Sequence, residues 1–69
     1  MRTPESIEFL RMVEKSKMRR IDIVRYLGIG ERTFYKWQNG ESVIPKTGMI
    51  AMYLLVKEPI PEGLRSPEM

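Results

Sequence analysis

Apolar side chains recur along the chain at intervals of three and four residues, the spacing that gathers them on one face of a helix. The pattern predicts helices over about 4–16, 20–27, 31–39 and 46–57. The β-branched cluster at residues 42–44 is too short to support a sheet. We therefore expect an all-α fold, a small bundle of four to five helices.

Local chemistry indicates where these helices begin and end. Thr3 followed by Pro4 and Glu5 is typical of a helix start, because threonine caps the first N–H groups and glutamate complements the helix dipole. Gly28 is predicted to end the second helix in the left-handed conformation. Gly30 is predicted to cap the third.

The segment 28–30 therefore joins two short helices, an arrangement typical of a helix-turn-helix. Ile29, the apolar residue of this turn, is expected to reach the core. Phe34 and Trp37 lie three positions apart in the following helix and are predicted to point inward as well. The alternative, a stacking platform for single-stranded nucleic acid, is disfavoured because the basic side chains occupy the opposite face.

Positive charge is concentrated in the middle of the chain. The whole sequence has a net charge of +3, but residues 15–46 hold eight Lys and Arg against three acids, a net charge of +5. The two ends together hold four cations and six acids, a net charge of −2. Such a segment suits a polyanionic partner such as nucleic acid. The alternative is a solvated basic surface without a partner.

The composition narrows the possible chemistry. The chain has no cysteine, no histidine and a single aspartate, so the usual metal sites and the usual acid–base and nucleophilic sets cannot be assembled. We therefore expect neither an enzyme nor a bound cofactor or metal. The longest apolar run, residues 49–56, is shorter than the ~20 residues that span a bilayer, and the N-terminus lacks a signal-peptide layout. A cytoplasmic protein without a membrane partner is expected.

Eight consecutive apolar residues at 49–56 exceed what one core-facing stripe of a helix can bury. We expect the surplus to form a homodimer surface, with closure over the chain's own core as the alternative. The Pro-rich segment 59–69 is predicted to be extended or to contribute Ile60 and Leu64 to the dimer, whereas 1–58 forms the folded domain. The residues predicted to form the dimer interface are Met49, Met52, Tyr53 and Val56.

This organisation resembles the DNA-binding domain of small phage repressors of the lambda repressor and Cro type, a helix-turn-helix family with many short bacterial regulators. The resemblance covers about residues 3–57. The chain departs from the family at Val24, where alanine or glycine is usual, and at Arg19 and Gly30, where serine or threonine caps are usual. The core positions of the family motif are matched by Ile23, Leu27, Gly28, Ile29, Phe34 and Trp37. The motif ends with Asn39-Gly40, as it often does in the family.

The resemblance implies that residues 31–39 lie in the major groove of double-stranded DNA. Base contacts are expected from Glu31, Arg32 and Lys36; Glu31 is equally explained as a favourable acid at a helix start. For Arg19 and Arg20, a solvated surface is the alternative to a phosphate contact. The residues expected to contact phosphate are Arg19, Arg20, Thr33, Tyr35 and Asn39.

The expected function is that of a dimeric transcriptional repressor that binds a palindromic operator. The run W-x-x-G followed by I-P at 44–45 is similar to short phage-borne repressors, including those that accompany anti-CRISPR genes. Control of its own phage or mobile-element operon is the implied role. The alternative is a protein-interaction module on the same scaffold, such as an antitoxin or an inhibitor of a host complex. The retention of Arg32 and Lys36 favours DNA binding over that alternative.

Overall fold

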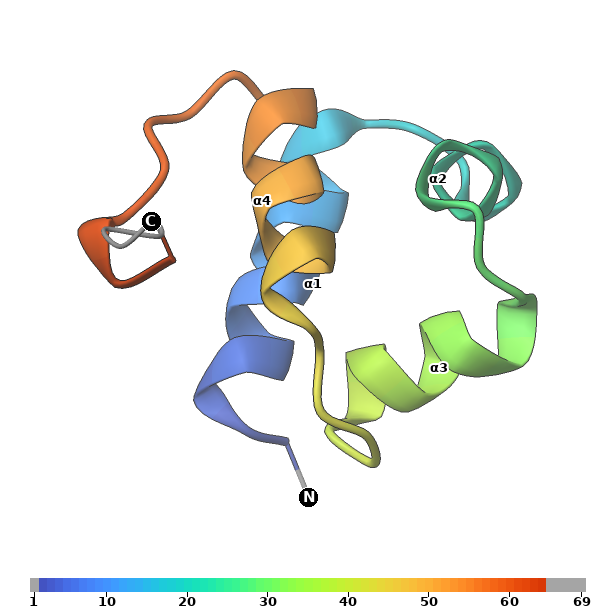
Figure 1. The fold of residues 1–69 in the computed structure, drawn as a ribbon. Coiled ribbons are helices and arrows are strands. Elements are labelled where there is room, and N and C mark those ends of the chain that lie inside the picture. The colour runs from blue at the N-terminus through green and yellow to red at the C-terminus, as the bar shows by residue number, and fades with distance from the viewer. Residues whose placement is uncertain (1, 65–69) are drawn as a thin grey trace.

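The computed structural model describes residues 2–64 of the chain. This part contains four α-helices and a short 3-10 turn, and it contains no β-strand. The helix α1 packs against both α3 and α4, and α2 packs against α3 (Figure 1). The predicted all-α class is therefore confirmed. The elements are α1 (Pro4–Ser16), α2 (Arg20–Leu27), α3 (Glu31–Asn39), α4 (Lys46–Leu55) and η1 (Glu62–Leu64).

The first three helices have the predicted bounds, whereas α4 ends at Leu55, two residues before the predicted end. Lys57 adopts a left-handed conformation with φ 60°, and the Glu58 N–H donates to the Tyr53 carbonyl at 3.0 Å. Pro59 follows directly, and the residue before a proline disfavours helical backbone. The left-handed conformation of Lys57 thus ends the helix before the apolar pattern does.

The start of α1 is fixed by a reciprocal cap. The Ser6 N–H donates to the Thr3 hydroxyl at 3.1 Å, and the Thr3 N–H donates to the Ser6 hydroxyl at 2.8 Å. These bonds satisfy two of the N–H groups that a helix start leaves without a partner. The predicted helix start at Thr3-Pro4 is confirmed.

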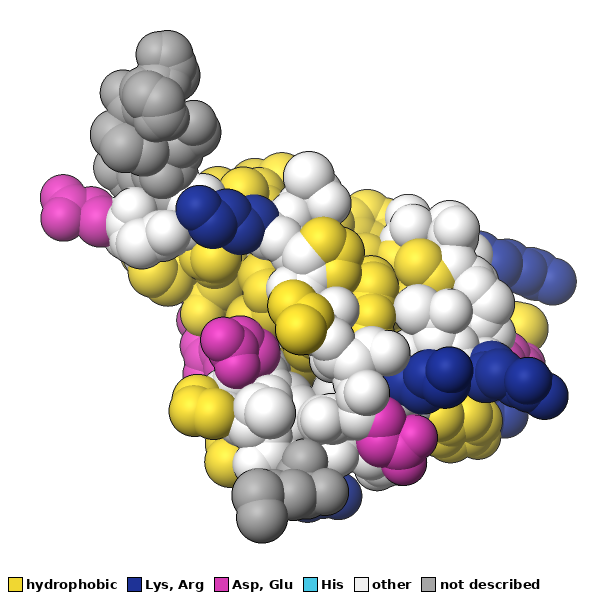
Figure 2. Space-filling view, turned by 60° about the horizontal axis from the view of Figure 1, so that its bottom comes forward, with side chains coloured by type: hydrophobic (Ala, Val, Ile, Leu, Met, Phe, Trp, Pro, Cys, Tyr) yellow, Lys and Arg dark blue, Asp and Glu magenta, His cyan; other side chains and the backbone are white. Residues whose placement is uncertain are grey.

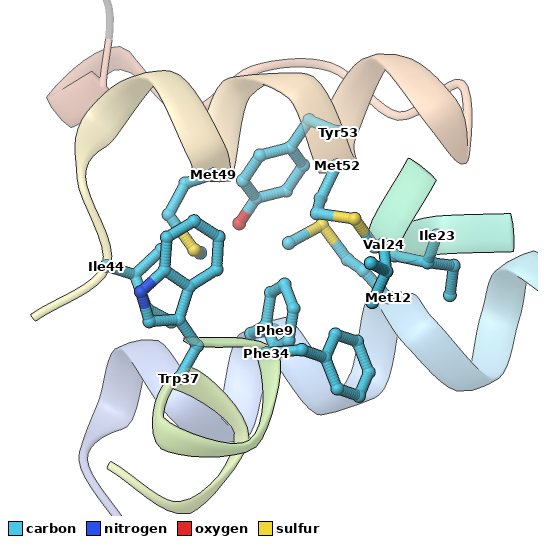
Figure 3. Close-up of a cluster of buried hydrophobic side chains, with 10 residues drawn as sticks. All are labelled: Phe9, Met12, Ile23, Val24, Phe34, Trp37, Ile44, Met49, Met52 and Tyr53. Carbon is cyan, nitrogen blue, oxygen red and sulfur yellow. The ribbon is translucent and has the colours of Figure 1, made fainter. Parts of the chain in front are cut away.

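All four helices contribute side chains to one core (Figure 3). Phe9 of α1 is fully buried and lies at its aromatic centre, with ring centroids 5.5 Å from Phe34 and 5.8 Å from Trp37. Both pairs have edge-to-face geometry, which is favourable for aromatic rings. The buried apolar residues are Phe9, Met12, Ile23, Val24, Phe34, Trp37, Ile44, Met49, Met52 and Tyr53.

A close contact between α4 and Trp37 sets the position of α3. Gly48 of α4 is buried, and a Cβ atom at this position would lie 3.0 Å from Trp37 Cη2. The indole therefore packs directly on the α4 backbone. This contact holds the C-terminal half of α3 against the core and leaves its opposite face toward solvent.

The segment after α4 folds back onto the core. Ile60 and Leu64 are half-buried against it, and η1 contacts α4. The sequence indicated no regular structure here, but a single 3-10 turn is present. Pro67 and the rest of 65–69 lie outside the described residues.

Candidate nucleic-acid interface

A three-residue turn connects α2 to α3. Gly28 has a left-handed φ of 71°, and its N–H donates to the Val24 carbonyl at 2.9 Å. Ile29 is half-buried and packs against the core, as predicted. Gly30 then has extended backbone and is the N-cap residue of α3. The turn thus fixes α3 relative to α2 through both a backbone reversal and an apolar contact.

Gly28→Ala is expected to lower the free energy of unfolding by about 1–2 kcal/mol, because an L side chain is disfavoured in the left-handed region. A Cβ atom at this position would meet nothing within 4 Å, so the cost is conformational and not steric. Gly28→Asn is the matched control and should retain most of the stability, since asparagine tolerates this conformation. Urea unfolding followed by circular dichroism measures both variants. An alanine variant as stable as the parent would contradict this reading of the turn.

The outward face of α3 carries the residues predicted to contact DNA. Glu31, Arg32, Tyr35 and Lys36 are exposed, whereas Phe34 and Trp37 on the other side of the helix are buried. Thr33 and Asn39 are half-buried at the edges of the outward face. The fold therefore places on one surface the α3 side chains that were predicted to contact DNA.

The cations on this face have no carboxylate partner within residues 2–64. Neither Arg32 nor Lys36 forms an ion pair with any carboxylate of residues 2–64, and neither does Arg20 at the start of α2. Arg19 is different, because its Nε donates to Asp22 Oδ2 at 3.1 Å. Several Lys and Arg side chains gather on the right-hand side of the molecule in Figure 2, the side on which Figure 1 places α2 and α3.

The N-termini of α2 and α3 also lack side-chain caps. Arg19 and Gly30 are the N-cap residues, and neither provides a side-chain hydrogen bond to the helix. In α1, by contrast, Thr3 and Ser6 form the complete capping box. Within the described part of the chain, the first N–H groups of α2 and α3 therefore have no side-chain acceptor. Helix N-termini in this condition favour anions.

The cations of α1 are neutralised within the chain. Arg11 donates to Glu8 at 2.6 Å and to Glu58 at 2.9 Å, and Lys15 also binds Glu58. The hydroxyl of Tyr53 donates to Glu8 at 2.6 Å. The unbalanced positive charge lies accordingly on α2 and α3 and not on α1. Lys15 belongs by position to the basic segment 15–46, but its charge is paired with Glu58 in this network.

The same network shifts several pKa values. Hydrogen bonds from Arg11 and then Lys15 lower the pKa of Glu58 from 4.5 to about 2. The pKa of Glu8 is lowered by its hydrogen bonds from Arg11 and Tyr53. Burial, together with the hydrogen bond to Glu8, raises the pKa of Tyr53 to about 12. The network therefore stabilises the ionised carboxylates and the neutral phenol.

Acidification is expected to destabilise the fold between about pH 4.5 and 2. In this range the unfolded chain binds a proton at Glu58 that the folded chain does not. The free energy of unfolding therefore decreases as the pH decreases. Glu58→Gln should flatten the dependence of the thermal midpoint on pH in this window. Glu31→Gln is the control, since Glu31 forms no ion pair within residues 2–64. Equal acid sensitivity of the parent chain and Glu58→Gln would contradict this role of Glu58.

The predicted dimer surface requires a correction. Met49, Met52 and Tyr53 are at most 5% exposed, because α4 turns this face toward the chain's own core, and Val56 is half-buried against it. The prediction of an exposed patch is therefore wrong for Met49, Met52 and Tyr53, and this face of α4 closes over the chain's own core, which was the alternative. The apolar side chain that α4 does expose is Leu54, which is 60% exposed.

Two contacts near the interface were not predicted from the sequence. The guanidinium carbon of Arg20 lies 5.4 Å from the centroid of the Tyr35 ring. The Tyr26 hydroxyl donates to the Ala51 carbonyl at 2.8 Å and so joins α2 to α4. Both join residues from different helices, and spacing along the chain carries no signal for such pairs.

A groove of about 530 Å³ between α1, α4 and η1 is lined mainly by apolar residues and includes no residue of α3. Residues 2–64 contain no group of three or more Asp, Glu, His or Cys side chains that could hold a metal ion. None of the helices described here has both the length and the apolar composition needed to cross a membrane.

Comparisons of the chain with known protein families, with curated proteins and with solved structures gave no match. Any function must therefore be argued from the geometry and charge of the interface itself.

Proposed function

We propose that the chain is a sequence-specific DNA-binding protein of the helix-turn-helix class, with the lambda repressor-like arrangement that its sequence resembles. In this proposal α3 lies in the major groove and α2 crosses the adjacent backbone. Its biological role is transcriptional repression, with no catalytic activity, cofactor or metal. The observation that carries the proposal is the outward face of α3. Arg32 and Lys36 are exposed there and have no carboxylate partner within residues 2–64, while Phe34 and Trp37 bury the opposite side of the helix in the core.

The residue roles follow from position and chemistry. Arg32 lies in the first turn of α3, where side chains come nearest to base edges, and its guanidinium suits the two acceptors of guanine. Lys36, one turn later, reaches the same groove as a point charge. Glu31 accepts from a cytosine amino group. Thr33 and Asn39, at the edges of the face, contact phosphates.

Phosphate binding at the N-terminus of α2 is supported by two features. Arg20 is exposed and unpaired within residues 2–64. The first N–H groups of α2 have no side-chain cap, and such a terminus attracts a phosphate. Arg19 contributes less charge, since Asp22 offsets it.

The proposal includes a homodimer, because one short helix reads too few base pairs to be specific and two-fold proteins bind half-sites about 34 Å apart. The apolar side chains that residues 2–64 leave most exposed are Ile7, Val43 and Leu54. These replace Met49, Met52 and Tyr53 as the residues available to a second copy.

Selection of bound sequences from a pool of random duplexes tests this function. The proposal predicts recovery of a palindrome whose half-sites are separated by about one helical turn. A variant with Arg32 and Lys36 both replaced by alanine is the control and should recover no motif. Failure of the parent chain to enrich any sequence would contradict sequence-specific binding.

A further inference from the structure

Arg20 and Tyr35 form a contact that links the two helices of the proposed interface. Arg20 is the first residue of α2, and Tyr35 is an exposed residue halfway along α3. The distance of 5.4 Å from the guanidinium carbon to the ring centroid is within the range of a cation–π interaction. The ring is 41% exposed, so the pair lies at the surface and not in the core.

The Arg20 guanidinium donates no hydrogen bond within residues 2–64. A guanidinium that stacks on an aromatic ring keeps its five N–H donors in its own plane, directed away from the ring. No carboxylate of residues 2–64 pairs with Arg20. The neighbouring Arg19 is oriented instead by its carboxylate partner Asp22, which occupies one of its N–H donors.

We propose that Tyr35 is a positioning residue, whose ring holds the Arg20 guanidinium over the α3 face so that its N–H donors bind a phosphate of the DNA backbone. This inference rests on the proposed function and changes one sequence-based assignment: Tyr35 acts through Arg20 and not through a phosphate contact of its own hydroxyl. The ring removes much of the rotational freedom that a free arginine would lose on binding. It also couples α2 to α3, so that the phosphate contact fixes the register of α3 in the groove.

A double-mutant cycle on a random-sequence duplex at low salt tests the assignment. Tyr35→Ala should weaken binding about 2- to 5-fold, the range expected for an exposed cation–π contact. Tyr35→Phe, which keeps the ring and removes the hydroxyl, should bind within error of the parent. Once Arg20 is alanine, Tyr35→Ala should cause no further loss, because the residue that Tyr35 positions is already gone.

Two results would overturn the inference while leaving DNA binding intact. Additive losses in the double variant would show that Tyr35 and Arg20 act independently. A loss for Tyr35→Phe as large as that for Tyr35→Ala would assign the role to the hydroxyl. If the parent chain binds no duplex at all, the proposed function fails, and this inference fails with it.

The free protein provides a readout that does not depend on DNA. Protons attached to Arg20 Cδ should be shifted upfield in the NMR spectrum by the Tyr35 ring. The shift should persist in Tyr35→Phe and disappear in Tyr35→Ala. Unshifted Arg20 protons in the parent chain would overturn the proposed positioning, even if the chain binds DNA.

Discussion

Phe9→Ala is expected to lower the free energy of unfolding by about 3–5 kcal/mol, the cost of removing a large aromatic side chain from a packed core. Phe9 is fully buried and makes edge-to-face contacts with Phe34 and Trp37, the two side chains that anchor α3. A domain of this size has a total stability of roughly 3–10 kcal/mol. Most of the stability should therefore be lost, and α3 should lose its support.

Urea unfolding followed by circular dichroism measures this effect. Ile7→Ala is the matched control, because it also truncates an apolar residue of α1, but one that is 58% exposed. At a protein concentration low enough to keep the chain monomeric, its effect should stay within about 0.5 kcal/mol. Similar midpoints for Phe9→Ala and Ile7→Ala would contradict the assignment of Phe9 to the centre of the core.

Arg32→Ala is expected to weaken binding to the selected duplex by about 1–3 kcal/mol and to relax preference at one base pair. The reason is that Arg32 is placed to read a base edge, and an unread base pair costs specificity as well as affinity. Its loss on a random duplex should be clearly smaller. Titrations of both duplexes, at several salt concentrations, give the two free energies.

Arg20→Ala provides the contrast. A phosphate contact carries no sequence information, so this variant should weaken binding to both duplexes alike and reduce the salt slope by about 1. Lys57→Asn is the charge control, since it removes an exposed cation that follows α4 and lies outside α2 and α3. Equal losses on both duplexes for Arg32→Ala would contradict base readout by this residue.

The helices could be predicted from the sequence because their signals are local. Thr3-Pro4 at the start of α1, Gly28 after α2 and the Phe34–Trp37 spacing in α3 each determine backbone or orientation within a few residues. The end of α4 was the exception, because the apolar pattern continues to Val56 whereas the backbone leaves the helix there and is left-handed at Lys57.

The side of α4 that faces the core could not be predicted in the same way. A run in which nearly every residue is apolar does not indicate which side faces the core, and Met49, Met52 and Tyr53 turned out to face it. The contacts of Arg20 with Tyr35 and of Glu58 with Arg11 join residues 15 and 47 positions apart. Such pairs depend on how the helices pack, and one sequence carries no direct signal for packing.

The outward face of α3 was predictable because burial and charge follow the same helical period. Phe34 and Trp37 define the inward side, and Arg32 and Lys36 then fall outside it. The sequence could not indicate whether neighbouring acids would neutralise these cations. In the described residues the acids Glu8 and Glu58 bind the cations of α1 instead, which leaves the charge of α3 unbalanced.

An NMR titration of the chain with a random-sequence duplex at low salt maps the bound surface residue by residue, and so shows whether α3 contacts the DNA. We expect amide signals to shift at the start of α2, through the turn at 28–30 and along the outward face of α3, and we expect added salt to reverse the shifts. Shifts confined to α1 and α4, or no shifts at any duplex concentration, would contradict this expectation.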